Sequence, residues 1–504
     1  MNQVPRLITL LSVEFRKSRH KHTFLLLAAS MALNYFFLFY GTSDKEQGWL
    51  NVFYAIPLTN TIVLSIQMTV LASQSVDLEN RSAMWNLLPT LTDRASIYLG
   101  KLLYGLIHLT LFCLLQMGMV VLLGTFLGFN GVVPFQTVMT TFAAELIGGM
   151  IVFQVQCLLS LLFSNQFAAL SVGFGGTLTG LFLAYISTYA WTPWSVLLSL
   201  SAVGMNYEES SRTMTLFWQN PSGTQLLIAL LYLTGTFLLG LCLFTKSEQG
   251  ERSARAPHRQ SSSLHNVMPV ELIKLKRSPV WIPFLLIPLI AAAIGTINFT
   301  QNQGVLQFTW EDLWAQHSLF LGAFFLAPLI GILCSLLWRM EHQGGNWNLI
   351  MTAVAPFKPV KDKWLTAALL ASLSMLWVAA IYLFTGKLLA LPGGVPVQFW
   401  SRMLCAVLCV AVIAAVQSML SLIFRSFAVP VALAFAGSIA GLAMVAKGTF
   451  YVSPYAMLIY GMGSTSITGD LNLPVFLVSC LLYLCGALTV STLVIKMRDV
   501  RTHV

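Results

Sequence analysis

Two ionisable side chains, His108 and Glu145, lie inside long runs of apolar residues. A charged group in the hydrocarbon of a membrane costs about 2.5 to 3.5 kcal/mol on insertion scales, so such residues mark function by default. A glutamate and a histidine on neighbouring spans could relay protons or contact a substrate. A structural, hydrogen-bonded glutamate is the third interpretation, and the sequence leaves all three open.

A second polar pattern occurs twice in the chain. The first copy consists of Glu79, Arg81, Trp85, Asn86, Leu87 and Leu88 and closes on Lys101, and the second consists of Glu341, Asn346, Trp347, Asn348 and Leu349 and closes on Lys363. In the first copy, Met84, Leu87, Leu88 and Leu91 fall at i, i+3, i+4 and i+7, so a helix here would carry one apolar stripe among polar residues. Such a helix needs a surface to dock against. The alternative is that both tryptophans belong to the aromatic belt of a membrane interface and the charged residues are only solvated.

The motifs of nucleotide, metal and nucleophilic chemistry are missing from the sequence. It contains no G-x-x-x-x-G-K-[ST] phosphate-binding loop. No polar stretch approaches the roughly 100 residues of an ordinary nucleotide-binding domain. The eight histidines are scattered. We therefore expect no cofactor in this chain and no catalytic residue. Any ATP and Mg would be bound by a partner.

The composition excludes a soluble protein. Charged residues make up 9% of the 504 residues and hydrophobic residues 57%, whereas a soluble domain carries about 25% charged residues. The eight cysteines fall in uncharged apolar stretches, where they act as small hydrophobes rather than as disulfide partners. The chain is therefore expected to be a polytopic membrane protein.

Twelve apolar stretches are long enough to span a membrane, which takes about 17 to 25 residues. The predicted spans are residues 24–40, 52–72, 102–126, 138–163, 167–185, 226–244, 280–297, 319–338, 364–385, 403–424, 427–446 and 475–495. Apolar residues at helical spacing between Val4 and Phe15 predict a short helix lying in the interface before the first span.

The basic residues are sorted by side of the membrane. Of all Lys and Arg residues, only Lys45, Arg212, Lys387, Arg402 and Lys447 fall on one side of these spans. The positive-inside rule then places both termini in the cytoplasm. The net charge of +10 reflects this topology, and we expect no nucleic-acid partner.

The chain also repeats itself. Glu341 follows Glu79 at an offset of 262 residues (341 − 79), and Lys363 follows Lys101 at the same offset. Six spans is an even number, so the second copy enters the membrane from the same side. We expect an all-α polytopic membrane protein of twelve transmembrane helices in two parallel six-helix repeats, residues 1–245 and 267–504, joined by a cytoplasmic linker at 246–266. In the second repeat, Ala406 occupies the position equivalent to Glu145, so a proton relay would have no second copy.

The twice-repeated Glu–Trp–Asn–Leu–Lys pattern resembles the permease subunits of ABC-2 type transporters. Among these it is most similar to the permeases of bacterial lantibiotic and bacitracin self-immunity exporters, with two six-span permease units fused in one chain. The resemblance implies that each copy packs on a separate ATP-binding-cassette subunit on the cytoplasmic side. It also implies a bacterial inner (plasma) membrane protein whose partners are two such subunits, membrane lipid and an amphipathic substrate. In that family the fifth span of each unit, or its neighbours, lines the substrate path at the midline. The resemblance therefore implies a candidate substrate path near Phe174 and Phe435, together with Glu145 and His108.

This reading predicts the permease of an ATP-driven exporter of antimicrobial-peptide-like or lipid-like molecules. One alternative is an ion-coupled secondary transporter of twelve spans, which the Glu145 and His108 pair favours. Another is a membrane sensor or scaffold that binds peptide without moving it.

Overall fold

The computed structural model describes residues 3–19, 23–41, 46–81, 92–163, 166–186, 190–208, 213–246, 271, 275, 281–304, 306–342, 355–424, 428–464 and 471–497. The chain divides into two compact units, Met1–Ser262 and Ser263–Val504, which we call the first and second halves. The expected linker at 246–266 lies outside the described residues except for its first residue.

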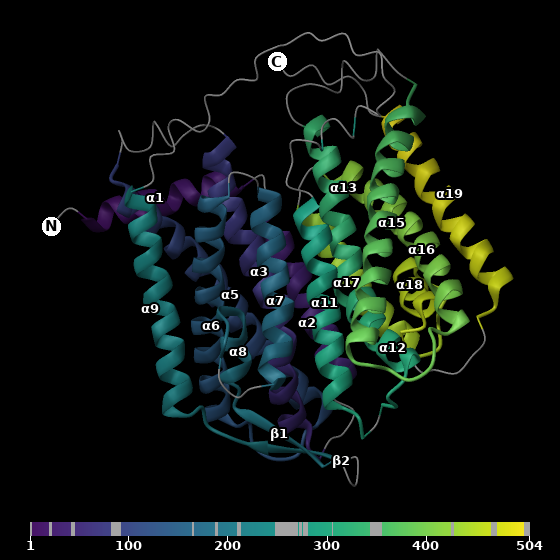
Figure 1. Cartoon of the computed structure of the whole chain (residues 1–504). Helices are drawn as coiled ribbons and strands as arrows, with labels where there is room; N and C mark the ends of the chain where they lie inside the picture. The colour runs from purple at the N-terminus through teal and green to yellow at the C-terminus, as the bar shows by residue number, and fades with distance from the viewer. Residues whose placement is uncertain are drawn as a thin grey trace. The chain divides into compact units, whose positions relative to one another are not determined.

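The first half is a helical bundle with one short hairpin. Its elements are α1 (Gln3–Ser18), α2 (Thr23–Gly41), α3 (Gly48–Arg81), α5 (Arg94–Leu127), α6 (Phe135–Leu162), α7 (Gln166–Ile186), the short helices η2 (Pro193–Ser195) and α8 (Val196–Ser199), strands β1 (Val203–Glu208) and β2 (Thr213–Trp218), and α9 (Gly223–Lys246). In Figure 1, α1 lies across one end of this bundle, and β1 and β2 lie at the other end.

The second half repeats the order of the long helices. Its elements are α11 (Trp281–Gln301), α12 (Trp310–Phe320), a π-helical turn η3 (Leu321–Phe325), α13 (Leu326–His342), α15 (Phe357–Leu388), α16 (Val397–Ile423), α17 (Ala428–Ala446), α18 (Pro454–Met462) and α19 (Leu473–Met497). Helices α12, η3 and α13 run on as one apolar segment, Trp310–Arg339.

Equivalent helices pack in the same way in each half. In the first half α6 packs against α3, α5 and α9, and in the second half α16 packs against α13, α15 and α19. The side chains buried along α2 recur along α11 at an offset of 257 residues (284 − 27), for example Leu27 with Phe284 and Asn34 with Ala291. The internal repeat of the sequence is thus a repeat of structure.

Local sequence sets the ends of the long helices. The Asp93 carboxylate accepts from the Ser96 backbone N–H at 2.9 Å and so caps the first turn of α5. At its other end Gly128 takes φ +70°, the left-handed conformation that a C-terminal cap requires.

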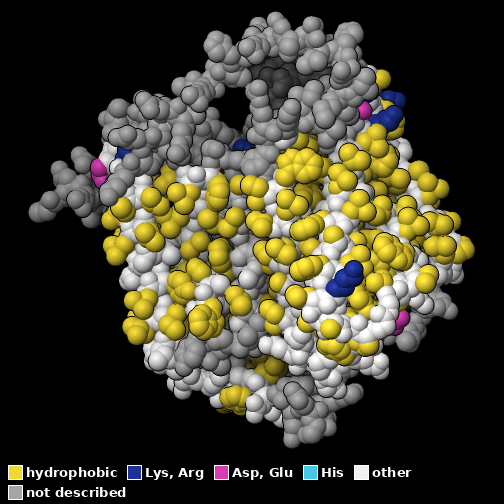
Figure 2. Space-filling model, in the orientation of Figure 1, with side chains coloured by type: hydrophobic (Ala, Val, Ile, Leu, Met, Phe, Trp, Pro, Cys, Tyr) yellow, Lys and Arg dark blue, Asp and Glu magenta, His cyan; other side chains and the backbone are white. Residues whose placement is uncertain are grey.

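Among the described residues, ten helices are long and apolar enough to cross a membrane. Two shorter apolar segments, Thr23–Phe36 and Ala168–Ala184, coincide with the first and fifth predicted spans. Hydrophobic side chains spread over the visible surfaces of the helices (Figure 2); on α9 and α19, Leu231 and Leu482 are 62% and 68% exposed. Such surfaces suit lipid rather than water. The all-α polytopic membrane fold is therefore confirmed, and the number twelve stays a prediction.

The antiparallel β1–β2 hairpin was not expected from the sequence. Val203 pairs with Trp218 at its base, and Val203 packs into an apolar cluster that includes Trp49 and Phe53. The hairpin therefore closes the end of the first bundle away from α1.

Candidate functional site

A buried lysine lies where α1, α3 and α5 meet. The Nζ atom of Lys101 lies 2.8 Å from Glu79 Oε1 and 3.5 Å from Glu14 Oε1, and donates to the Ser75 carbonyl at 2.8 Å. The Nζ atom of Lys17 lies 3.1 Å from both carboxylates. We call Glu14, Lys17, Glu79 and Lys101 the first acid–lysine cluster.

The second half carries the same arrangement. The Nζ atom of Lys363 lies 2.9 Å from Glu341 Oε1 and 3.1 Å from Glu271 Oε2, and donates to the Leu337 carbonyl at 2.8 Å. The ammonium also lies 5.2 Å from the centre of the Trp338 ring, within cation–π range. Glu271, Glu341 and Lys363 form the second acid–lysine cluster.

Pairing of opposite charges explains why these side chains are buried together. The Lys101 and Lys363 side chains are 0% and 1% exposed, and a buried charge is tolerated only where opposite charges and hydrogen bonds compensate it. The first cluster contains two carboxylates and two ammonium groups, so its formal charges cancel. It joins three helices at the end of the bundle, just before the repeated polar pattern continues beyond α3.

The predicted docking residues divide into two sets. Glu79 and Glu341 were expected among the polar residues around a docking helix; they are 1% and 4% exposed and are paired inside their own halves, and their part in coupling to a partner stays a prediction. Their burial has a simple cause, because a buried lysine retains its charge only with anions around it. The other expected residues cannot be placed: the backbone of Arg81 ends α3 and its side chain is outside the described part, as are all atoms of Trp85, Asn86, Leu87, Leu88, Asn346, Trp347, Asn348 and Leu349.

Glu145 belongs to a buried amide network in the first half. Asn60 Nδ2 donates to Glu145 Oε1 at 2.6 Å and to Gln116 Oε1 at 2.8 Å. Gln116 Nε2 donates to Asn34 Oδ1 at 3.0 Å, and Asn34 Nδ2 donates to Asn60 Oδ1 at 2.9 Å. All four side chains are at most 1% exposed. This amide network ties α2, α3, α5 and α6 together.

The second half has no counterpart of this network. The repeat places small or apolar residues at the four equivalent positions, which are Ala291, Gly322, Val378 and Ala406. The four positions thus differ as a set between the halves, and each interior is consistent, because a single buried carboxyl without the amides would lack partners.

His108 and Glu145 do not form a pair. His108 Nδ1 lies 3.0 Å from the Tyr104 carbonyl, and its ring lies 5.4 Å from Phe15 and 5.6 Å from Phe24, centre to centre. His108 lies eight residues, about 12 Å, along α5 from Gln116, which belongs to the amide network. No hydrogen bond or ion pair joins the two residues, both of which the structure describes. A direct proton transfer between them is not supported.

Phe174 on α7 and Phe435 on α17 are 5% and 3% exposed. Their assignment to a substrate path stays a prediction. Within the described ranges no group of three or more His, Cys, Asp or Glu side chains could hold a metal ion.

Paired glycines seat one aromatic residue in each half. A Cβ at Gly176 would lie 2.6 Å from the Trp194 ring, and a Cβ at Gly437 would lie 2.5 Å from the Tyr455 ring. Both aromatics belong to short helices, η2 and α18, and Tyr455 also accepts from Gln417 Nε2 at 2.6 Å. These glycines therefore permit close packing of the short helices.

A family model described as ABC-2 family transporter protein matches residues 10–184 and again residues 267–441. The two matches together cover more than half of the chain. The chain belongs to this family. It is thus a multi-pass membrane permease component of an ABC transporter, a transport subunit, and permeases of this family work with ATP-binding-cassette subunits. No curated protein sequence matches the chain.

Sequence reasoning about this ABC-2 permease missed three residues, namely Asn34, Asn60 and Gln116. Their signal was present, because each is an amide inside an otherwise apolar span. Glu14 and Glu271 were not among the predicted site residues, and their place beside the lysines follows from how the helices meet.

Proposed function

We propose that this ABC-2 permease supplies both membrane halves of an ATP-driven exporter in the bacterial plasma membrane, with both termini in the cytoplasm. Two ATP-binding-cassette subunits would bind it, one on each of the segments 82–91 and 343–354. The observation that carries the proposal is the duplicated acid–lysine cluster. Each cluster fixes the helix that leads directly into one of these segments.

Force from a partner would pass through the clusters. In the first half the segment is continuous with α3 before it and α5 after it, and Lys101 binds Glu79 of α3 and Glu14 of α1. A displacement of the segment would thus move three helices as one body instead of bending a single helix. Lys363, Glu341 and Glu271 would do the same in the second half. ATP and Mg would act only in the partner subunits.

An amphipathic substrate, such as an antimicrobial peptide or a lipid-like molecule, fits this arrangement best. The resemblance to lantibiotic and bacitracin self-immunity permeases favours it, and so do the apolar surfaces of α9 and α19, because molecules partitioned into lipid would meet them first. Outward transport, which would clear such molecules from the membrane, is proposed on the same grounds.

The test is transport by the full chain in liposomes with and without its ATP-binding-cassette partner. We expect copurification of two partner subunits per chain and ATP-dependent movement of a fluorescent cationic amphipathic peptide. The double variant Trp85→Ala/Trp347→Ala should keep the fold and lose this transport. A matched control is Trp191→Ala, since Trp191 is 69% exposed and lies outside both segments.

Two results would contradict the proposal. Transport by the chain alone, driven by a pH gradient and abolished by Glu145→Gln, would establish the ion-coupled carrier. Binding of peptide and partner without movement of peptide would establish a sensor or scaffold.

A further inference from the structure

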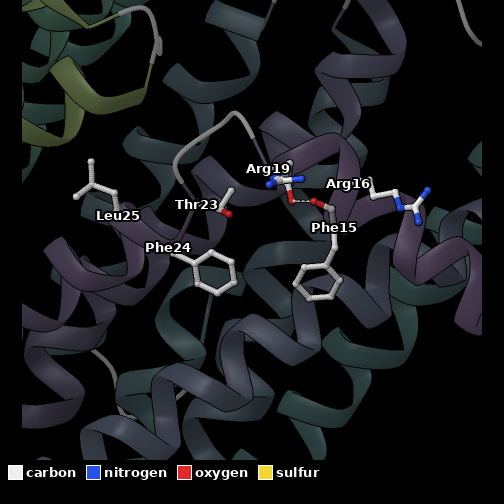
Figure 3. Close-up of a pocket in the computed structure, with 7 residues that line it drawn as sticks. Phe15, Arg16, Arg19, Thr23, Phe24 and Leu25 are labelled. Atoms are coloured by element: carbon white, nitrogen blue, oxygen red, sulfur yellow. Dashed lines mark hydrogen bonds between the residues drawn. The ribbon is translucent and has the colours of Figure 1, made fainter.

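A hollow of about 470 Å³ opens where α1 meets α2. Its walls are formed by Phe15, Arg16, Ser18, Arg19, Thr23, Phe24 and Leu25. Figure 3 shows the rings of Phe15 and Phe24 beside one another, with Arg19 above them in this view and Arg16 to one side. The hollow therefore joins a basic rim to an aromatic floor.

The two arginines carry charge that the protein does not neutralise. Arg16 and Arg19 are exposed, and neither has a carboxylate within ion-pair distance among the described residues. Lys17, which lies between them in sequence, is compensated by Glu14 and Glu79. Of the three neighbouring basic side chains, Arg16, Lys17 and Arg19, the two without a carboxylate partner among the described residues are the two that line the hollow.

The apolar part of the hollow includes the first turn of α2, the helix that coincides with the first predicted span. Phe24 and Leu25 are 59% and 54% exposed in the first turn of α2. The rings of Phe15 and Phe24 both contact the buried His108 ring, at 5.4 Å and 5.6 Å between centres, so packing holds the floor in place. A ligand here would meet cationic groups at one end and apolar surface at the other.

We propose that this hollow binds one acidic phospholipid. Guanidinium groups bind phosphate oxygens through charge-assisted hydrogen bonds. Arg16 and Arg19 line the hollow at the C-terminal end of α1, the helix that lies across the end of the bundle, and are placed to make such bonds. The acyl chains would follow Phe24 and Leu25 down the outside of α2. Anionic lipids are attracted to such basic segments at a membrane surface. The site does not depend on the proposed export of a substrate.

The site would also stabilise the first acid–lysine cluster. Glu14 and the two arginines belong to the same helix, α1. A lipid that binds the folded chain but not the unfolded chain raises its stability by RT ln(1 + c/Kd), where c is the free lipid concentration. Occupancy would therefore keep Glu14 against Lys101.

Native mass spectrometry of the full chain in detergent, titrated with phosphatidylglycerol or phosphatidylcholine, tests the site. We expect one phosphatidylglycerol to bind more tightly than the rest, and Arg16→Gln/Arg19→Gln to weaken it by roughly tenfold or more, as expected when charge-assisted hydrogen bonds are lost. The matched control is Lys358→Gln/Lys361→Gln, which removes two exposed charges from the start of α15, the helix equivalent to α5. This control should leave the tight lipid in place.

Leu25→Ser and a soluble competitor separate a lipid from a bare phosphate. Leu25→Ser should weaken phosphatidylglycerol binding without changing the unfolding temperature of the lipid-free chain, and glycerol phosphate should not displace the lipid. Displacement by glycerol phosphate, equal loss in the two double variants, or unchanged binding in Arg16→Gln/Arg19→Gln would each overturn the proposal.

Discussion

Lys101 and Lys363 make the same backbone contact in the two halves: each Nζ donates at 2.8 Å to the carbonyl of the residue 26 positions earlier. Those carbonyls belong to Ser75 and Leu337, near the ends of α3 and α13. Since a carbonyl contact does not depend on side-chain type, it persists although serine and leucine differ. The lysine therefore locks one helix end onto the next helix in each copy.

Replacing either buried lysine by methionine should destabilise the chain strongly. Lys101→Met leaves Glu14 and Glu79 with less compensation, and removing one partner of a buried ion pair costs about 3 to 5 kcal/mol. Thermal unfolding in detergent measures the loss. Lys17→Met is the control, because Lys17 pairs with the same carboxylates but is 21% exposed; its effect should be clearly smaller. Equal losses in Lys17→Met and Lys101→Met would contradict the assignment of Lys101 as the centre of the cluster.

The amide network should depend more on its amides than on the charge of Glu145. Glu145→Gln keeps an oxygen that accepts from Asn60, so we expect normal folding and retained ATP-dependent transport. Asn60→Leu removes the donor to both Glu145 and Gln116, and leaving buried polar groups unsatisfied costs about 1 to 3 kcal/mol each. Unfolding temperatures and transport rates of the two variants check this. An unstable Glu145→Gln beside a stable Asn60→Leu would refute the described network.

A carboxyl placed at the equivalent position of the second half should not be tolerated. Ala406 is fully buried, and Val378 and Gly322 stand where Gln116 and Asn60 stand in the first half. A buried polar group without partners costs roughly 2 to 7 kcal/mol, and a charge costs more. Ala406→Glu should therefore yield little folded protein by size-exclusion chromatography. Ala406→Met, of similar length and without charge, should yield more; comparable yields would show that volume alone decides.

Glycines that seat the short helices should resist even a methyl group. A Cβ at Gly180 or Gly441 would lie 2.8 Å from a backbone carbon, that of Trp194 or Tyr455. Overpacking of this kind costs about 1 to 3 kcal/mol. Gly175→Ala is the matched control in the same helix as Gly180, because nothing lies within 4 Å of its added Cβ. It should be neutral or stabilise by up to about 1 kcal/mol through helix propensity, and unfolding temperatures distinguish the two cases.

The sequence predicts helix positions well here because long apolar runs are a strong signal. All twelve predicted spans coincide with helices of the structure, which extend beyond the apolar cores, as when α3 continues to Arg81. The hairpin of β1 and β2 carried a weaker signal, since each strand has only six residues, far fewer than an apolar span.

Side-chain partners were harder to predict than helices. The sequence pattern includes both Glu79 and Lys101. The residues around a carboxylate in a polar segment do not reveal whether it contacts a partner protein or a lysine of its own bundle. Only the meeting of α1, α3 and α5 decides between them. The amides of Asn34 and Gln116 lie far apart in sequence, and neutral amides in spans commonly join helices, so nothing local marks them as one network.

The amide network has a consequence for how this transporter is built. In an assembly of two identical subunits, the Glu145 carboxyl group would be present twice or not at all. Joining two diverged halves in one polypeptide allows a single copy, with Ala406 in the other half. Covalent fusion thereby fixes a one-to-one pairing of unlike partners that separate genes could not guarantee.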